Sequence, residues 1–143
     1  MIKKIDHINI SVTDLEESKK IFIDLLGFRL EKEEILKGKW MDKIVGLSRA
    51  KAKYAKLVFP NARINIELIQ YYNPLGDKDP KIDQVNRIGF RHVALEVKNI
   101  DKEYQRLKNL GVHFFSNVQI HGKKRLCYFS GPDKIILELA EYN

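Results

Sequence analysis

An internal repeat limits the folds open to this chain more than any other feature of the sequence. A histidine that opens a strand-like run occurs at His7 and again at His92. After each run comes a helical pattern that ends at a leucine and a glycine. Each copy then closes with an aliphatic run interrupted by a single glutamate, Glu67 in the first and Glu138 in the second. The repeat therefore predicts two modules of the same topology.

Hydrophobic period and turn residues predict the same order in both modules, a strand, a helix and three further strands. In the first module we expect strands over residues 5–12, 28–35, 53–59 and 63–71, and a helix from a capping box at Thr13 and Glu16 to residue 26. In the second we expect strands over 89–97, 112–116, 125–130 and 134–141 and a helix over 100–110. The predicted class is α+β, with βαβββ modules at 1–72 and 89–143, a linker at 73–88, and one cupped mixed β-sheet.

Strand alternation places four polar side chains opposite the aliphatic faces of their strands. These candidates are His7, Glu67, His92 and Glu138. If the aliphatic faces pack under the helices, the opposite faces line a concave cavity. Two imidazoles and two carboxylates suit one divalent metal ion and leave two coordination positions open. Nickel, cobalt, zinc, manganese and iron are all compatible with such a donor set.

A simpler interpretation treats these residues as structural or solvated. It is our expectation for His113 and His121, which have no repeat partner, and for Glu31, Glu33 and Glu96, which fit the wet face of a sheet. The two glutamates inside aliphatic runs are harder to explain in this way, because an unpaired buried carboxylate is costly.

Composition narrows the classes of function. The 143 residues carry a net charge of +7, which attracts acidic ligands, but the lysines are spread along the chain without the clustered pattern of a nucleic-acid platform. No apolar run is long enough for a membrane span and the first residues lack a signal core, so we expect a soluble cytoplasmic protein that binds neither nucleic acid nor membrane. The single cysteine, Cys127, lies in an apolar run, where we expect burial rather than reactivity.

One segment of the first half has no counterpart in the second. It spans residues 37–47, and Trp40, Ile44 and Leu47 share one face of a short helix there. Two interpretations stay open: a lid or substrate-recognition insert, and a helix packed at a module or subunit interface.

The chain resembles the vicinal oxygen chelate superfamily, which includes glyoxalase I, methylmalonyl-CoA epimerase, extradiol dioxygenases, fosfomycin-resistance enzymes and bleomycin-binding proteins. The motifs that carry the resemblance are HINISV at His7, IELIQY at Glu67, GFRHVALEV at His92, and RLCYFSGPD with LEL at Glu138. The resemblance implies that the first, fourth, fifth and eighth strands each supply one metal ligand, which would be these four residues.

A ligand on the fourth strand is typical of the glyoxalase and epimerase branch, so the resemblance implies a metal-dependent lyase or isomerase similar to lactoylglutathione lyase. Such an enzyme moves a proton beside a metal-chelated carbonyl or hydroxyl of a small, anionic, possibly thiol-conjugated substrate, and forms a homodimer. Glu138 is the first choice for the base and Glu67 the second. The alternatives are a methylmalonyl-CoA epimerase-like enzyme, which usually has glutamine at the Glu67 position, and a non-catalytic antibiotic-binding or resistance protein.

Overall fold

The computed structural model describes residues 1–143, and the chain divides into two compact units, residues 1–78 and 79–143. The boundary between the units falls inside the segment that the sequence predicts as a linker. Each unit contains one copy of the repeat and is described by itself. None of the helices is both long and apolar enough to cross a membrane.

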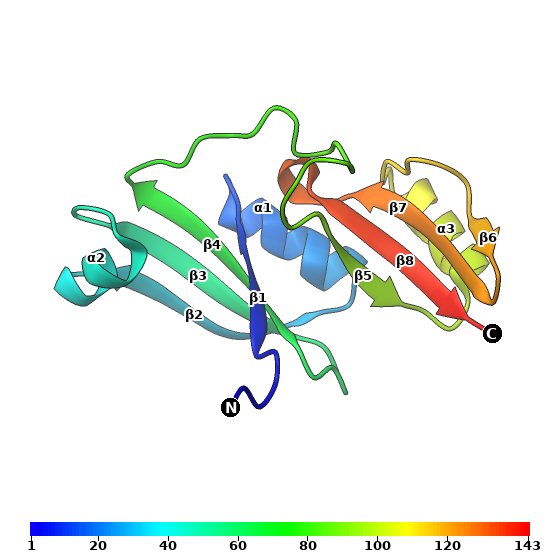
Figure 1. Ribbon diagram of the computed structural model, residues 1–143, viewed down its shortest axis with the longest axis horizontal. Coiled ribbons are helices and arrows are strands. Elements are labelled where there is room, and N and C mark those ends of the chain that lie inside the picture. The colour runs from blue at the N-terminus through cyan, green and yellow to red at the C-terminus, as the bar shows by residue number, and fades with distance from the viewer. The chain divides into compact units, whose positions relative to one another are not determined.

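The first unit is a four-stranded sheet with one helical segment after its first strand and a short helix inserted between its second and third strands (Figure 1). Its elements are β1 (His7–Ser11), α1 (Leu15–Lys20), the π-helical turn η1 (Ile21–Leu25), β2 (Arg29–Lys37), α2 (Lys39–Val45), β3 (Lys51–Val58) and β4 (Asn65–Asn73). The strand order is β1-β4-β3-β2, with β1 parallel to β4 and the other neighbours antiparallel. A parallel pair needs a crossover, and α1 is part of the long connection between β1 and β4.

The second unit repeats this topology without the inserted helix. Its elements are β5 (His92–Glu96), α3 (Ile100–Asn109), β6 (Gln119–His121), β7 (Lys124–Ser130), the 3-10 turn η2 (Pro132–Lys134) and β8 (Ile136–Tyr142). The order β5-β8-β7-β6, with β5 parallel to β8, matches the order of the first sheet strand for strand. The predicted α+β class and the two βαβββ modules are confirmed.

Two local predictions are wrong. Residues 112–116 form no strand; only Phe114 makes an isolated bridge to Phe129, and β6 lies later in the chain. Two backbone hydrogen bonds to β7 flank this bridge. The chain then leaves β7 before it returns as β6, so the segment pairs with a neighbouring strand at one residue only. Thr13 does not cap α1: the Asp14 carboxylate accepts a hydrogen bond from the Glu17 backbone N–H at 3.0 Å. An ionised cap at the positive end of the helix dipole explains this shift of one residue.

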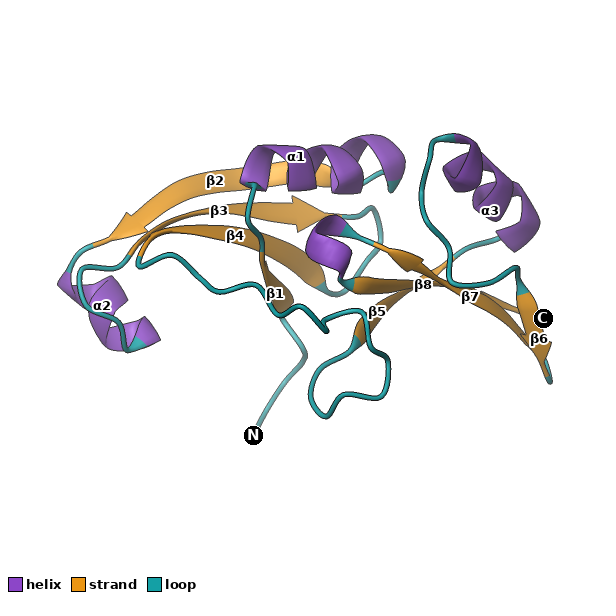
Figure 2. Cartoon of the chain, turned by 90° about the horizontal axis from the view of Figure 1, so that it is seen from above, coloured by secondary structure: helices purple, strands orange, loops and turns teal.

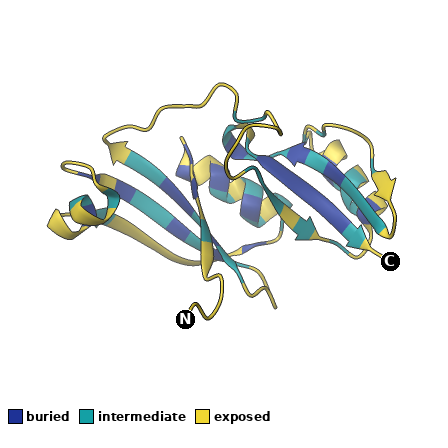
Figure 3. Ribbon diagram, viewed as in Figure 1, coloured by how far each residue is buried: buried dark blue, intermediate teal, exposed yellow.

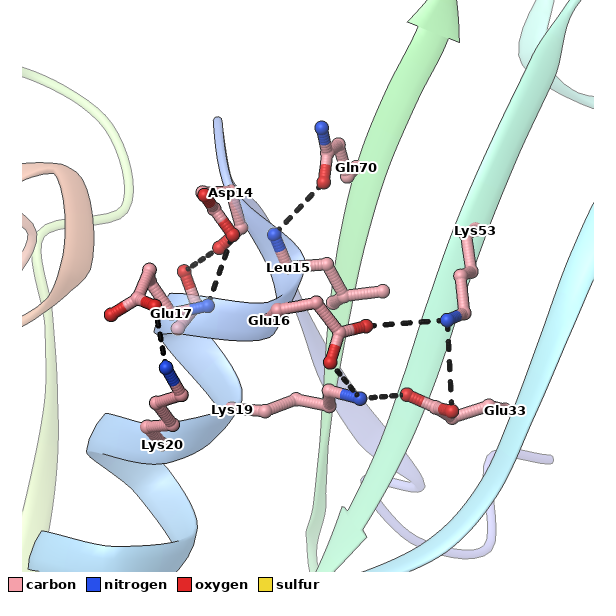
Figure 4. A network of polar contacts seen from close by, with 10 residues as sticks. Asp14, Leu15, Glu16, Glu17, Lys19, Lys20, Glu33, Lys53 and Gln70 are labelled. Atoms are coloured by element: carbon pink, nitrogen blue, oxygen red, sulfur yellow. Dashed lines mark hydrogen bonds and ion pairs between the residues drawn. The ribbon is translucent and has the colours of Figure 1, made fainter.

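Ion pairs fasten α1 to the sheet on its covered face (Figure 4). Lys19 on the helix contacts Glu33 on β2, and Glu16 on the helix lies 3.3 Å from Lys53 on β3. Leu15, on the apolar side of the helical segment, is buried between these ion pairs and β4. The segment ends where the sequence predicts, at Gly27, whose φ of +79° is readily adopted only by glycine.

The core of the second unit is centred on β8, which is buried from Ile136 to Ala140 (Figure 3). One side of this strand packs under α3 through the aliphatic residues Leu137 and Leu139, whereas the other side carries Glu138. A strand buried on both faces explains why its sequence reads as an almost continuous apolar run.

In the first unit, α1 and α2 lie on opposite faces of the sheet (Figure 2). Met41 of α2 is 2% exposed and packs with Ala52 of β3 and Ile69 of β4. By strand alternation, Ile69 shares its face with Glu67, and the register of β1 against β4 adds His7 to that face. The inserted helix therefore covers one end of the face that carries the candidate ligands.

Candidate metal centre

The two modules place a histidine and a glutamate in the same relation. In the first, His7 lies opposite Asn65 in the parallel ladder, and Glu67 is two residues further along β4. In the second, His92 lies opposite Ile136, and Glu138 is two residues further along β8. Two residues is one period of a strand, so in each module both side chains project from the same face. The sequence repeat is thus a repeat of a two-residue constellation.

The pair in the first module is open to solvent. His7 Nε2 lies 3.4 Å from Glu67 Oε2, and the two side chains are 41% and 21% exposed. The other ring nitrogen, Nδ1, lies 3.1 Å from a carboxylate oxygen of Asp6. This contact is the largest of the interactions that lower the pKa of Asp6, and Lys4 adds to it. A carboxylate on the far nitrogen is the usual orienting partner of a metal-binding imidazole, because it leaves Nε2 free to act as a ligand.

The pair in the second module is more enclosed. His92 Nε2 lies 3.0 Å from Glu138 Oε2, and the Tyr128 ring centroid is 5.0 Å from that of the imidazole. Tyr128 stands opposite Glu138 in the β7–β8 ladder, so it forms one wall of this pair. Glu138 is only 2% exposed, which makes it one of two buried polar side chains in the chain. A carboxylate at this depth needs a compensating charge or ligand.

Lys124 supplies such a charge. Its Nζ lies 2.5 Å from Glu138 Oε1, and its interaction with that carboxylate is the main reason that the pKa of Lys124 is raised. At this distance the ammonium donates to the carboxylate, so Oε1 is held by Lys124. The buried carboxylate is therefore charge-balanced by a cation, and a metal ion bound at Oε1 would have to displace it.

The donor set fits a divalent cation. In each unit a histidine nitrogen faces a carboxylate oxygen at contact distance, and the buried Glu138 carboxylate is already held by a cation, Lys124. Neither unit by itself gathers three His, Cys, Asp or Glu side chains, so each contributes at most half of a four-ligand site. The structure brings His7 to Glu67 and His92 to Glu138, and the complete site of all four stays a prediction.

A hollow of about 300 Å³ adjoins the first pair. It lies on the ligand-bearing face of the first sheet, under the N-terminal end of α2. Its lining residues are Asn9, Glu34, Leu36, Trp40, Tyr54, Glu67 and Ile69. Because Glu67 belongs both to the pair and to the lining, a molecule in this hollow would touch the candidate metal ligand directly.

The remaining candidates of the sequence stand apart from this chemistry. His113 and His121 are exposed and belong to neither pair. Cys127 is buried, as predicted, and burial together with the nearby Glu138 raises the pKa of its thiol to about 11. A buried thiol with so high a pKa is a poor nucleophile near neutral pH, in agreement with the expected burial of Cys127.

Sequence reasoning missed three contributors to the site. Lys124 and Tyr128 share the β7 face that meets Glu138, and strand alternation alone would have found both once β7 was paired with β8. Tyr54 was missed for the same reason in β3. The signal was present in the alternation, but the order of strands in each sheet was needed to use it.

The pairing of a histidine strand with a glutamate strand in each module agrees with the family to which the sequence is matched. The family model of the Glyoxalase/Bleomycin resistance protein/Dioxygenase superfamily matches residues 4–139, nearly the whole chain. The chain belongs to this superfamily. Its members include enzymes such as glyoxalase I and also proteins without catalytic activity, so membership by itself does not fix an activity.

Individual relatives cover the whole length of the chain. The uncharacterized protein YaeR of Escherichia coli is 29% identical, over 98% of this chain and 97% of its own. The uncharacterized protein YwkD of Bacillus subtilis is 27% identical, over 99% and 98%. The crystal structure of a glyoxalase family protein from Bacillus cereus superposes with a TM-score of 0.88 at 29% identity, over 99% of this chain and 95% of that one.

Proposed function

We propose that this chain is a metal-dependent lyase or isomerase of the glyoxalase kind, acting on a small molecule that presents two neighbouring oxygens. The proposal gives His7, Glu67, His92 and Glu138 to one divalent ion, which would be nickel, cobalt, zinc, manganese or iron. The observation that carries it is the identical register of the two histidine–glutamate pairs. Solvated or structural side chains have no reason to keep the same offset in both modules.

When bound, a divalent ion would polarise the substrate oxygens and so acidify the adjacent C–H. The chain supplies the groups that hold and move the proton. Glu138 is the first choice for this role, because its burial keeps bulk water from competing for the proton. Glu67 is the second choice, because it borders the hollow in which a substrate would lie. Two carboxylates in different surroundings suit a reaction that removes a proton at one carbon and returns it at another.

The test begins with metal content. After purification and dialysis we expect about one divalent ion per site by plasma mass spectrometry, and we expect His7→Ala and His92→Ala each to lower metal affinity by roughly tenfold or more. His121→Ala is the matched control, since this exposed histidine belongs to neither pair. Equal metal binding by all three variants would remove the proposed ligand set.

Activity is then screened with a hemithioacetal, a malonyl thioester and a catechol, each with several metals. Proton transfer on the hemithioacetal supports the proposal, whereas epimerisation of the thioester alone would assign the epimerase reaction instead. Glu138→Gln keeps the size of the side chain and removes its basicity, so we expect turnover to fall by about two orders of magnitude or more. Unchanged turnover in this variant would exclude Glu138 as the base. No bound metal and no activity with any added metal would leave a non-catalytic binding protein.

A further inference from the structure

The hollow beside Glu67 has a composition that selects a particular kind of ligand. Trp40 and Tyr54 contribute aromatic rings, and Leu36 and Ile69 contribute aliphatic surface. Its volume of about 300 Å³ is at the lower end of the range for small-molecule sites, enough for a single or fused ring with short substituents. A planar apolar group therefore fits both its size and its walls.

The charges of the hollow are as informative as its rings. Glu34 and Glu67 both line it, and no lysine or arginine does. The Lys32 ammonium lies 2.9 Å from Glu34, and this hydrogen bond and charge lower the pKa of the Glu34 carboxyl. In the metal-free protein a carboxylate or phosphate in the hollow would face two carboxylates, of which Glu34 alone is paired with a lysine, so we expect the occupant to be uncharged or cationic there. The anionic tail that the net charge of the protein suggests has to lie elsewhere.

Trp40 occupies an unusual position for so large an apolar side chain. It is 52% exposed, although the next residue along α2, Met41, is almost completely buried in the core below the helix. Gly38 precedes it with a φ of +103°, and the Trp40 ring lies within van der Waals distance of the place that a Gly38 side chain would occupy. The indole ring thus stands at the edge of the hollow with half of its surface uncovered, while the next residue anchors the helix to the core.

We propose that this hollow is the site for an uncharged aromatic group of the substrate, held against Trp40 and Tyr54, with the neighbouring oxygens of the substrate directed toward Glu67. The inference rests on the proposed function for the second half of this statement only. It assigns the 37–47 insert to substrate recognition. The preference for a ring would then depend on a segment that only the first of the two modules contains.

The experiment uses three probes that differ in one feature each. Mandelamide and lactamide are neutral and share the same two neighbouring oxygens, but one carries a phenyl ring and the other a methyl group. Mandelate keeps the ring and adds a negative charge beside it. Because Trp40 is the only tryptophan of the chain, its fluorescence reports directly on occupation of the hollow. Calorimetry supplies the dissociation constants for the wild type and for variants.

We expect mandelamide to bind about tenfold or more tightly than lactamide, since burial of a ring removes much more apolar surface from water than burial of a methyl group. Mandelamide should change the Trp40 emission, and mandelate should bind more weakly than mandelamide in metal-free protein. Trp40→Ala should reduce the preference for mandelamide over lactamide to about twofold, and Trp40→Phe should restore most of it. Ile44→Ala, at an exposed position on the same helix, should leave it unchanged.

The titrations are run both in EDTA and with added metal, which separates this inference from the proposed function. A preference for the ring that persists in EDTA supports the hollow even if no metal ever binds. Equal affinities for mandelamide and lactamide in both conditions would overturn the inference, as would an unchanged preference in Trp40→Ala. Trp40 emission that depends on protein concentration and not on any probe would also overturn it, because a second copy of the chain would then cover the ring.

Discussion

Replacement of Lys124 by methionine separates the two roles that Glu138 can have, a member of an internal ion pair and a metal ligand. The variant keeps the length of the side chain and removes the cation 2.5 Å from Glu138 Oε1. The carboxylate is 2% exposed, so it would be left buried with only His92 as a partner. We therefore expect the metal-free variant to be less stable than the wild type.

The size of this loss follows from the burial of the two partners. Removal of one partner from a fully buried ion pair costs roughly 3–5 kcal/mol, whereas an exposed pair contributes about 0–1 kcal/mol. Lys124 is 29% exposed, so water screens its end of the pair, and an intermediate loss of about 2 kcal/mol is expected. With an unfolding entropy of roughly 2.1 cal/mol/K per residue, this corresponds to a decrease in Tm of about 7 °C.

If the metal takes the place of the ammonium group, the free energy of the Lys124–Glu138 pair also opposes metal binding by the wild type. The wild type has to break the Lys124–Glu138 pair in order to bind the ion, and the variant does not. About 2 kcal/mol corresponds to roughly 30-fold tighter binding by the variant. Saturation with metal should then bring the Tm of the variant close to that of the metal-loaded wild type, since an ion that binds only the folded state stabilises it.

Thermal unfolding and metal titration by calorimetry measure both quantities. Lys123→Met is the control, because it removes the same charge from an adjacent exposed position and should change stability by less than about 0.5 kcal/mol. A loss of stability in Lys124→Met without tighter metal binding would refute the reasoning: Glu138 would then be a structural carboxylate that Lys124 neutralises, and not a ligand.

Two further predictions concern the packing of the second unit and its cysteine. Gly131→Ala would place a Cβ atom 2.9 Å from side-chain atoms of Ile135 and Leu137, so overpacking should destabilise the protein by about 1–3 kcal/mol in a denaturant titration. The control is Gly76→Ala, which has nothing within 4 Å of its Cβ position and should be neutral or slightly stabilising in the same titration. Burial raises the pKa of Cys127 to about 11, so roughly one in a thousand of these thiols should be ionised near pH 8. We expect Cys127 to react with Ellman's reagent only after unfolding, and rapid labelling of the native protein would contradict its burial.

The module topology could be predicted because two sources of information coincided. Strand alternation fixed the faces, and the repeat fixed which strand of one module corresponds to which strand of the other. Residues 112–116 show the limit of this approach. Their alternation is that of a strand, yet they pair only at Phe114, because partner strands and not local pattern decide whether a ladder continues. The cap of α1 is a similar case. Thr13 and Asp14 are both good capping residues, and Asp14 occupies the N-cap position in the structure.

The candidate ligands could likewise be read from the sequence, but their partners could not. Lys124 reaches Glu138 across the β7–β8 ladder at a diagonal, a contact that requires the register of two strands and the reach of a long side chain. The hollow under α2 was out of reach for another reason. It depends on Met41 anchoring the insert to the ligand-bearing face, and the sequence left open whether that helix covers this face or an interface.

Comparison of the two pairs suggests a division of labour between modules that share one topology. Lys56 stands opposite Glu67 in the β3–β4 ladder, but its ammonium lies 2.7 Å from Glu31, so Glu67 keeps His7 as its close partner and faces the hollow. In the second module Tyr128 takes the equivalent position, and Lys124 pairs with a carboxylate that is almost inaccessible. The open pair presents its glutamate to the adjoining hollow, and the enclosed pair keeps its glutamate out of bulk water, which suits the base of the proposed reaction. Each copy of the duplicated module thus keeps the register of its histidine–glutamate pair, while the neighbouring strands give the two glutamates different surroundings.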